Sequence, residues 1–159
     1  MRGLTVLQPW AFQIARHKIY ETRTWRTNYR GPVAIHAGTR FNKPEREVVQ
    51  MFSDAGIWMP SSFTTGAVVV VADLVDCIPL MDTPATLRKC IGLPDGSPIP
   101  ARLALQYFGG AGVTGERLGI YGFVLENKRL LREPYPIRGA RMLWTVPPGA
   151  CAEILQRAA

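Results

Sequence analysis

Three ionisable residues, Lys18, Glu21 and Arg23, lie close together in the sequence and are followed by an aromatic residue, Trp25. We expect residues 19–26 to be extended. Side chains alternate between the two faces of a strand, so Glu21, Arg23 and Trp25 would share one face. Lys18 would lie at the turn just before them. Charged groups beside an aromatic ring make a poor core, so we take this stretch as the candidate site.

The charged residues have two chemical interpretations. Glu21 and Arg23 alone could form an ion pair that joins two strands, since a paired buried charge is tolerated where a lone one is not. Lys18 alone also suits the end of a preceding helix, where positive charge is favourable. Together, the three residues supply two cations for one anion, which leaves a donor for a ligand. Glu21 can also hold the charge state of the lysine or accept a proton.

Aromatic residues and a histidine could complete a ligand site. Trp25 beside hydrogen-bonding charges suits a single-stranded RNA base, which is held by stacking and by contacts to its edge. Trp10 is interpreted as a core or cleft-wall residue, and His36 as either an internal histidine or a cleft residue. Trp58 and Trp144 are interpreted as packing residues.

Metal and nucleotide-cofactor sites are not predicted. The sequence has only His17 and His36, with no Glu or Cys at ligand spacing, so we expect no catalytic metal. The glycine-rich run at 109–112 lacks the Lys-Ser/Thr pair and the preceding strand of a phosphate-binding loop. We therefore expect no cofactor.

The charged stretch belongs to a longer ordered set of motifs. They are Gln8-Pro9-Trp10, Lys18-x-x-Glu21-x-Arg23, Trp25-Arg26-Thr27-x-Tyr29-Arg30-Gly31-Pro32, Ile35-His36-Ala37, Phe123-Val124-Leu125-Glu126-Asn127, Pro134-Tyr135-Pro136-Ile137-Arg138-Gly139 and Leu143-Trp144. In this order they resemble the ASCH domain family of the PUA-like superfold. The resemblance touches both ends of the chain and leaves residues 80–117 unmatched. Arg16 stands where the family pattern has Gly.

The resemblance implies an α+β fold: a small mixed PUA-like β-barrel flanked by short helices, with a cleft on one side. Members of the family bind RNA or single nucleosides, and some are coactivator modules. Others are ribonucleases or amidohydrolases of N4-acetylcytidine, in which the lysine matched by Lys18 serves in catalysis. The amidohydrolase branch has Thr where this chain has Glu21, and a glutamate where this chain has valines at 68–71. This chain is more similar to the coactivator-like branch.

These observations lead to one main functional hypothesis and two alternatives. The main hypothesis is an RNA- or nucleotide-binding module with a basic, aromatic-walled cleft, whose partner is single-stranded RNA or a modified nucleotide. One alternative is an amidohydrolase or ribonuclease with Lys18 and Glu21 as catalytic residues. The other is a protein-interaction module that binds an acidic protein. The expected ligand-binding residues are Gln8, Trp10, Lys18, Glu21, Arg23, Trp25, Arg26, Arg30 and His36.

The net charge of +7 is concentrated in two segments. Residues 16–30 and 128–141 each carry five Arg or Lys residues against one Glu, and the rest of the chain is close to neutral. Arginine dominates both segments, and its planar fork suits phosphate and base edges better than lysine does. The charge distribution therefore favours a polyanionic partner.

We expect one domain over residues 1–159, because the chain is long enough to bury a core. The Pro- and Gly-rich residues 80–117 are interpreted as an insertion over the barrel, with short helices near 84–91 and 100–108. The expected strands are 4–7, 33–37, 67–75, 118–127, one beginning at 130 and 143–146, and the other helices are 10–16, 42–56 and 149–157. The β-branched strand at 67–75 should be buried on both faces.

Cysteine usage and hydropathy indicate a cytoplasmic protein without a membrane span. Cys77, Cys90 and Cys151 are odd in number and widely spaced, so neither a disulfide framework nor a zinc site is expected. The longest apolar run, residues 67–72, is far too short to span a membrane, and the N-terminus lacks a signal-peptide pattern.

Overall fold

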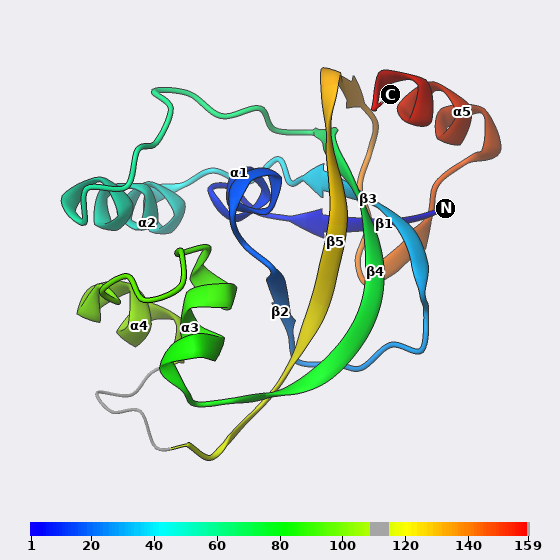
Figure 1. Cartoon of the computed structure of the whole chain (residues 1–159). Coiled ribbons are helices and arrows are strands. Elements are labelled where there is room, and N and C mark those ends of the chain that lie inside the picture. The colour runs from blue at the N-terminus through cyan, green and yellow to red at the C-terminus, as the bar shows by residue number, and fades with distance from the viewer. Residues whose placement is uncertain (109–114, 159) are drawn as a thin grey trace.

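A computed structural model describes residues 1–108 and 115–158 as strands and helices that follow one another along the chain (Figure 1). The strands are β1 (Arg2–Val6), β2 (Tyr20–Arg23), β3 (Gly31–Ala37), β4 (Ala67–Met81), β5 (Arg117–Pro136) and β6 (Leu143–Thr145). The helices are α1 (Trp10–Arg16), α2 (Lys43–Asp54), α3 (Pro84–Ile91), α4 (Ala101–Phe108) and α5 (Pro148–Arg157).

These strands form one sheet in the order β2-β5-β4-β3-β1-β6. β1 and β3 run parallel, and the other neighbouring strands run antiparallel. β4 and β5, with 15 and 20 residues, form a long ribbon whose register shifts bend it. The predicted α+β architecture is confirmed.

The sheet differs from the prediction because it is open rather than a closed barrel. Its edge strands are short: β2 pairs with β5 alone and β6 with β1 alone among the described residues. The Arg23 guanidinium on β2 donates to the Thr5 carbonyl oxygen on β1 at 2.8 Å.

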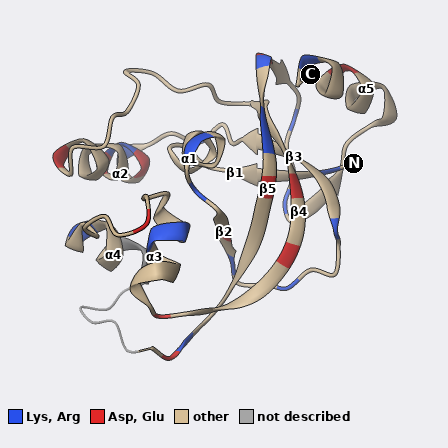
Figure 2. Cartoon of the chain, in the orientation of Figure 1, with Lys and Arg blue, Asp and Glu red and all other residues tan. Residues whose placement is uncertain are grey.

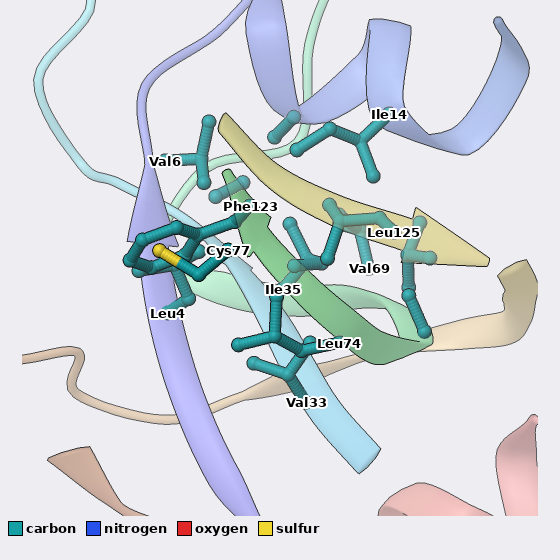
Figure 3. Packing of buried hydrophobic residues seen from close by; sticks show 14 residues of the cluster. Leu4, Val6, Ile14, Val33, Ile35, Val69, Leu74, Cys77, Phe123 and Leu125 are labelled. Atoms are coloured by element: carbon teal, nitrogen blue, oxygen red, sulfur yellow. The ribbon is translucent and has the colours of Figure 1, made fainter. Parts of the chain in front are cut away.

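The two faces of the sheet bury different clusters. The larger cluster includes Leu4, Val33, Ile35, Leu74 and Phe123, and it is covered by α1 (Figure 3). On the opposite face, α5 packs its own apolar residues against the sheet, together with Trp144. A third cluster joins α2 to α3 and α4, and these three helices lie together away from α5 (Figure 1).

Several elements follow directly from local sequence signals. Asn42 and Glu45 form a capping box at the start of α2, with Pro44 in the first turn. α3 and α4 occupy the positions predicted for two short helices. Residues 67–72 of β4 are all buried, because one face contacts the α1 cluster and the other the α5 cluster. The prediction of a strand buried on both faces is confirmed.

The prediction of two separate strands around Asn127 is wrong, because β5 continues from Arg117 to Pro136. Asn127 has a positive φ of 47° and its side chain donates to Asp73 on β4 at 2.9 Å, so the strand bends without ending. Pro134 and Pro136 lie where β5 pairs with β4 but not with β2, since β2 pairs only with residues 121–124 of β5.

The connection between β4 and β5 starts and ends at the same point of the ribbon. The Asp82 N–H donates to the Glu116 carbonyl at 2.7 Å, and the Gly115 N–H donates to the Asp82 carbonyl at 2.8 Å. Residues 109–114 of the expected insertion lie outside the described residues. Within the described part of the chain, no helix has the length and apolar character needed to cross a membrane.

Candidate functional site

Lys18, Glu21 and Arg23 are brought together by the turn that joins α1 to β2; we call these three residues the Lys18 cluster. α1 ends where the N–H groups of His17 and Lys18 both donate to the Gln13 carbonyl, at 2.9 and 2.8 Å. This turn directs the Lys18 side chain into the protein, where its exposed fraction is 0%. The chain then enters β2, which carries Glu21 and Arg23.

The Lys18 ammonium lies between an acidic residue, a carbonyl and an aromatic ring. Its Nζ donates to the Cys90 carbonyl oxygen at 2.6 Å and lies 3.4 Å from Glu21 Oε2. The same Nζ is 5.3 Å from the centre of the Trp10 ring. A buried ammonium is strongly unfavourable without such compensation, and here it has both an opposite charge and hydrogen-bond acceptors.

Helix α3 supplies the Cys90 carbonyl from its last turn. The last carbonyl groups of a helix accept no hydrogen bond from within the helix, and they lie at the negative end of the helix dipole. α3 ends in a left-handed cap at Gly92, and the Ile19 N–H donates to the Lys89 carbonyl at 3.0 Å. Lys18 follows α1, as predicted for a helix-end cation, but its charge stabilises the end of α3.

Glu21 and Arg23 complete the Lys18 cluster on the β1 side. Glu21 is 6% exposed, and its Oε1 lies 3.0 Å from the Arg23 guanidinium. The same Arg23 nitrogen donates to the Thr5 carbonyl, while the buried Arg23 Nε has no hydrogen-bond partner within the part of the chain that the structure describes. The expected ion pair is therefore present, and Glu21 lies between two cations.

Two neighbouring groups have shifted pKa values. Burial, and then the positive charge of Lys18, lower the pKa of Lys128, whose Nζ donates to the Lys18 carbonyl at 2.7 Å. Burial raises the pKa of the Cys90 thiol to about 12. Since the thiolate is the nucleophilic form of cysteine, Cys90 is not an activated nucleophile.

The two tryptophans predicted at the site, Trp10 and Trp25, each pack against a phenylalanine. Trp10 contacts Phe52 edge-on, with ring centres 5.4 Å apart, and lies beside the Lys18 ammonium. Trp25 contacts Phe123 edge-on at 5.0 Å and lies beyond the end of β2, so it does not continue the face of that strand. Both rings are half-buried.

An exposed aromatic residue lies elsewhere on the surface. Trp58 is 64% exposed, so its interpretation as a packing residue is wrong. The Arg16 guanidinium lies 5.4 Å from the centre of the Trp58 ring and 5.5 Å from that of Phe12. Trp58 follows α2 in a segment without helix or strand, and its sequence context gave no signal of this contact. Trp144, by contrast, packs against the α5 cluster as predicted.

The remaining predicted residues have separate positions. Gln8 is buried, accepts from the Phe12 N–H at 2.9 Å and donates to the Thr64 carbonyl at 2.8 Å, so it holds the start of α1. Arg26 is exposed and lies over the Tyr121 ring at 5.8 Å. Arg30 forms an ion pair with Asp76 at 2.8 Å.

His36 lies on the α5 face of the sheet, apart from the Lys18 cluster. Its ring contacts Trp144 edge-on at 6.1 Å, and its Nε2 lies 2.9 Å from the Ile137 carbonyl oxygen. Burial lowers the pKa of His36, and hydrogen bonds to the Ile137 and Gly66 backbone oppose this shift. His36 is buried, which agrees with the internal-histidine alternative that the sequence left open, and alternation along β3 separates it from the charged cluster.

The described residues offer no group of three or more His, Cys, Asp or Glu side chains that could hold a metal ion. The chemistry available at the Lys18 cluster is therefore that of ammonium, guanidinium and carboxylate groups. These groups bind and orient anions or polar ligand edges.

Comparisons with known proteins concern the fold. No family model and no curated protein matches the sequence. The structure is similar to the crystal structure of ASCH from Zymomonas mobilis, with a TM-score of 0.56, 11% identity, and coverage of 99% of this chain and 95% of that one. Two point mutants of that protein match with TM-scores of 0.56 and 0.55, identities of 13% and 12%, and coverage of 99% of this chain and 98% and 96% of theirs.

These structural matches extend over nearly the whole chain and agree with the resemblance seen in its ordered motifs. The chain has the fold of the ASCH-domain proteins.

Proposed function

We propose that this protein is a binding module for single-stranded RNA or a nucleotide, with phosphate contacts made by arginines of residues 16–30 and 128–141. The main support is that these two basic segments meet at Lys18 and Lys128. Lys128 donates to the Lys18 carbonyl across a sequence separation of 110 residues. Figure 2 shows basic residues both at the end of α1 and on the neighbouring part of β5.

The accessible charge of the segments supports this proposal. The arginines that are exposed are Arg16, Arg26, Arg30, Arg129, Arg132, Arg138 and Arg141. Of these, Arg30 alone forms an ion pair within the described residues. The others retain positive charge that a phosphate backbone could neutralise, with release of its counterions.

The cation–ring contacts add a way to hold bases. Arg16 lies over Trp58, and Arg26 lies over Tyr121. Aromatic rings provide stacking surfaces for unpaired bases, and the arginine planes can stack as well. An aromatic wall was expected at Trp25, but the exposed ring of Trp58 is better placed for stacking.

The Lys18 cluster favours binding over catalysis. A reactive lysine must meet its substrate, whereas the Lys18 side chain is fully buried and its ammonium donates to Cys90. We propose that the cluster positions β2 and its Arg23 side chain against β1. Lys18 and Glu21 would then affect ligand binding indirectly, because they fix the position of the surface that carries Arg26.

A salt titration of oligonucleotide binding tests the proposal. Fluorescence anisotropy of a labelled oligouridine should give an affinity that falls steeply with salt concentration. Arg26→Ala and Arg132→Ala should each weaken binding and reduce the salt slope by about 0.7 for each phosphate that the variant no longer neutralises. Arg46→Ala is the matched control, because Arg46 is an exposed arginine on α2, outside both segments.

Two results would contradict the proposal. One is an affinity that does not change with salt. The other is an equal effect of Arg46→Ala and the two segment variants, which would indicate attraction by net charge alone. Binding of an acidic protein in the absence of oligonucleotide binding would instead support the protein-interaction alternative.

A further inference from the structure

A pocket lies on the α5 face of the sheet, between the ends of β1 and β3 and residues 137–141. Its volume is about 700 Å³, within the range of pockets that enclose small ligands. Its lining includes Thr5, His36, Gly38, Gly66, Arg138 and Arg141. We call it the His36 pocket.

Two polar atoms in the wall of the His36 pocket have no hydrogen-bond partner among the described residues. They are Thr5 Oγ1 and His36 Nδ1, and both are buried. The whole His36 residue is 2% exposed. Buried polar atoms are nearly always satisfied, so each unsatisfied atom in a pocket wall indicates a partner from outside the chain.

The hydrogen bond to Ile137 defines the role of His36 Nδ1. A carbonyl oxygen only accepts, so the Nε2 atom that faces it carries the proton. Burial lowers the pKa of His36, which keeps the imidazole neutral near pH 7. Nδ1 is then an acceptor that an N–H or O–H donor would satisfy.

Gly139 brings the third segment of the pocket close to these atoms. A Cβ atom at position 139 would lie 2.4 Å from His36 Nδ1 and 2.5 Å from Thr5 Oγ1. Only a residue without a side chain permits this approach. The approach also places the neighbouring Arg138 and Arg141 in the wall of the same pocket.

The charge of the pocket wall is positive. Arg138 and Arg141 are exposed, and no described carboxylate pairs with either of them. None of the described Asp or Glu residues lines the pocket. Two guanidinium groups beside a neutral acceptor suit an anion that also carries a hydrogen-bond donor, and the planar guanidinium fork matches the geometry of phosphate oxygens.

We infer that the His36 pocket binds a nucleoside phosphate, with its phosphate on Arg138 and Arg141 and a base N–H or sugar O–H donated to His36 Nδ1. The phosphate and the donor follow from the pocket itself, whereas the choice of a nucleoside rests on the proposed function. Such a ligand has two sources, a free nucleotide and the phosphorylated end of an RNA chain.

The test compares AMP, adenosine and inorganic phosphate by isothermal titration and by ¹⁵N NMR of the histidine side chains. We expect saturable binding of AMP, at least tenfold weaker binding of adenosine and of phosphate, and a shift of the His36 Nδ1 resonance. A 5′-phosphorylated oligonucleotide and its 5′-hydroxyl counterpart form the second arm. Binding of either phosphorylated probe, with the His36 shift, supports the inference and identifies the source.

The Arg138→Ala/Arg141→Ala variant should bind the phosphorylated probe at least tenfold more weakly. Both side chains are exposed, and the backbone amide spectrum reports whether the fold is kept. Arg46→Ala is the control and should bind as the parent does. His36→Gln should weaken binding of AMP but leave that of inorganic phosphate unchanged, because only AMP uses the acceptor atom.

The inference is overturned if neither phosphorylated probe binds, or if binding persists in the double arginine variant or leaves the His36 resonance in place. An ordinary water molecule would then be the partner of His36 Nδ1. Failure of the proposed function gives a different result: salt-dependent binding of 5′-hydroxyl oligouridine would be absent while AMP still binds. Loss of AMP binding alone would leave the arginine-dependent RNA surface intact.

Discussion

The Lys18 ammonium and the Cys90 main-chain oxygen lie 2.6 Å apart, although 72 positions separate these residues in the chain. This hydrogen bond joins the turn after α1 to the last turn of α3. With Glu21 on its other side, the lysine connects the sheet edge to the helices that cover it. The charged motif of the sequence is thus an element of tertiary structure as well as a candidate site.

Replacing Lys18 with Met should strongly destabilise the protein. The change leaves the Cys90 carbonyl without its donor and Glu21 with Arg23 as its remaining charge partner among those described here. Breaking a buried ion pair costs about 3–5 kcal/mol, and we expect a loss of this size in the free energy of unfolding. Urea denaturation measures it.

The double variant Lys18→Met/Glu21→Gln provides the control for this effect. It removes both charges, so it should lose less stability than the sum of the two single variants. Additive losses would show that Lys18 and Glu21 do not interact. If Lys18→Met lowers the free energy of unfolding by less than about 1 kcal/mol, the Lys18 ammonium behaves as a solvent-exposed charge and not as a buried one.

Gly92→Ala should separate a steric effect from backbone strain. Gly92 has a φ of +93°, and an added Cβ would lie 3.0 Å from the Lys18 backbone nitrogen. Gly96 has a φ of +75° and no atom within 4 Å of an added Cβ, so Gly96→Ala measures strain alone. We expect about 1–2 kcal/mol for Gly96→Ala and roughly 1–3 kcal/mol more for Gly92→Ala. Equal midpoints of thermal unfolding would show that Lys18 does not restrict position 92.

Stability should decrease as the pH falls below about 6.5. Burial lowers the pKa of His36 from 6.5, so below that pH the unfolded chain binds a proton that the folded chain does not. Stability from this residue is fully present above pH 6.5 and is lost as the pH falls toward the folded-state pKa.

His36→Gln should flatten this part of the pH profile, as measured by thermal unfolding in steps between pH 5 and 8. Exposed His17 offers the matched control, and His17→Gln should retain the parent slope. A parent slope in the His36 variant would assign the pH dependence to other groups.

The cysteines should differ in reactivity without taking part in binding. Cys90 is fully buried with a thiol pKa of about 12, and Cys77 is also buried, whereas Cys151 is partly exposed. At pH 8, a thiol reagent should modify Cys151 first and the other two only as the protein unfolds. A folded variant with all three replaced by Ala or Ser should bind oligouridine as the parent does. Rapid modification of Cys90 in the native protein would contradict its burial.

Local signals in the sequence predicted much of the fold. The Asn42 capping box located α2, and the valine run located β4, because both signals depend on neighbouring residues. The spacing of Lys18, Glu21 and Arg23 also predicted that these charges would meet. Their partners could not be predicted, since the Cys90 carbonyl and the Thr5 carbonyl come from segments whose position depends on tertiary packing.

Non-local pairing also explains the errors. β5 continues through Asn127 because β4 accommodates the bend through register shifts, which a single segment cannot reveal. The open sheet has the same origin, because closure depends on the length of β2 and β6 and on how they meet. Exposure of Trp58 likewise depends on the path of a segment without regular structure.

The hydrogen bonds that join Asp82 to Gly115 and Glu116 have a consequence for how relatives of this chain could vary. Since the connection leaves and rejoins the ribbon at one point, its length could change without shifting the register of β4 and β5. A relative with a short turn there would keep the sheet but lack the α3 carbonyl that receives Lys18. Its lysine would lose that acceptor and keep Glu21 and the Trp10 ring as neighbours. Connection length could thus determine, from one relative to the next, which groups hold this lysine.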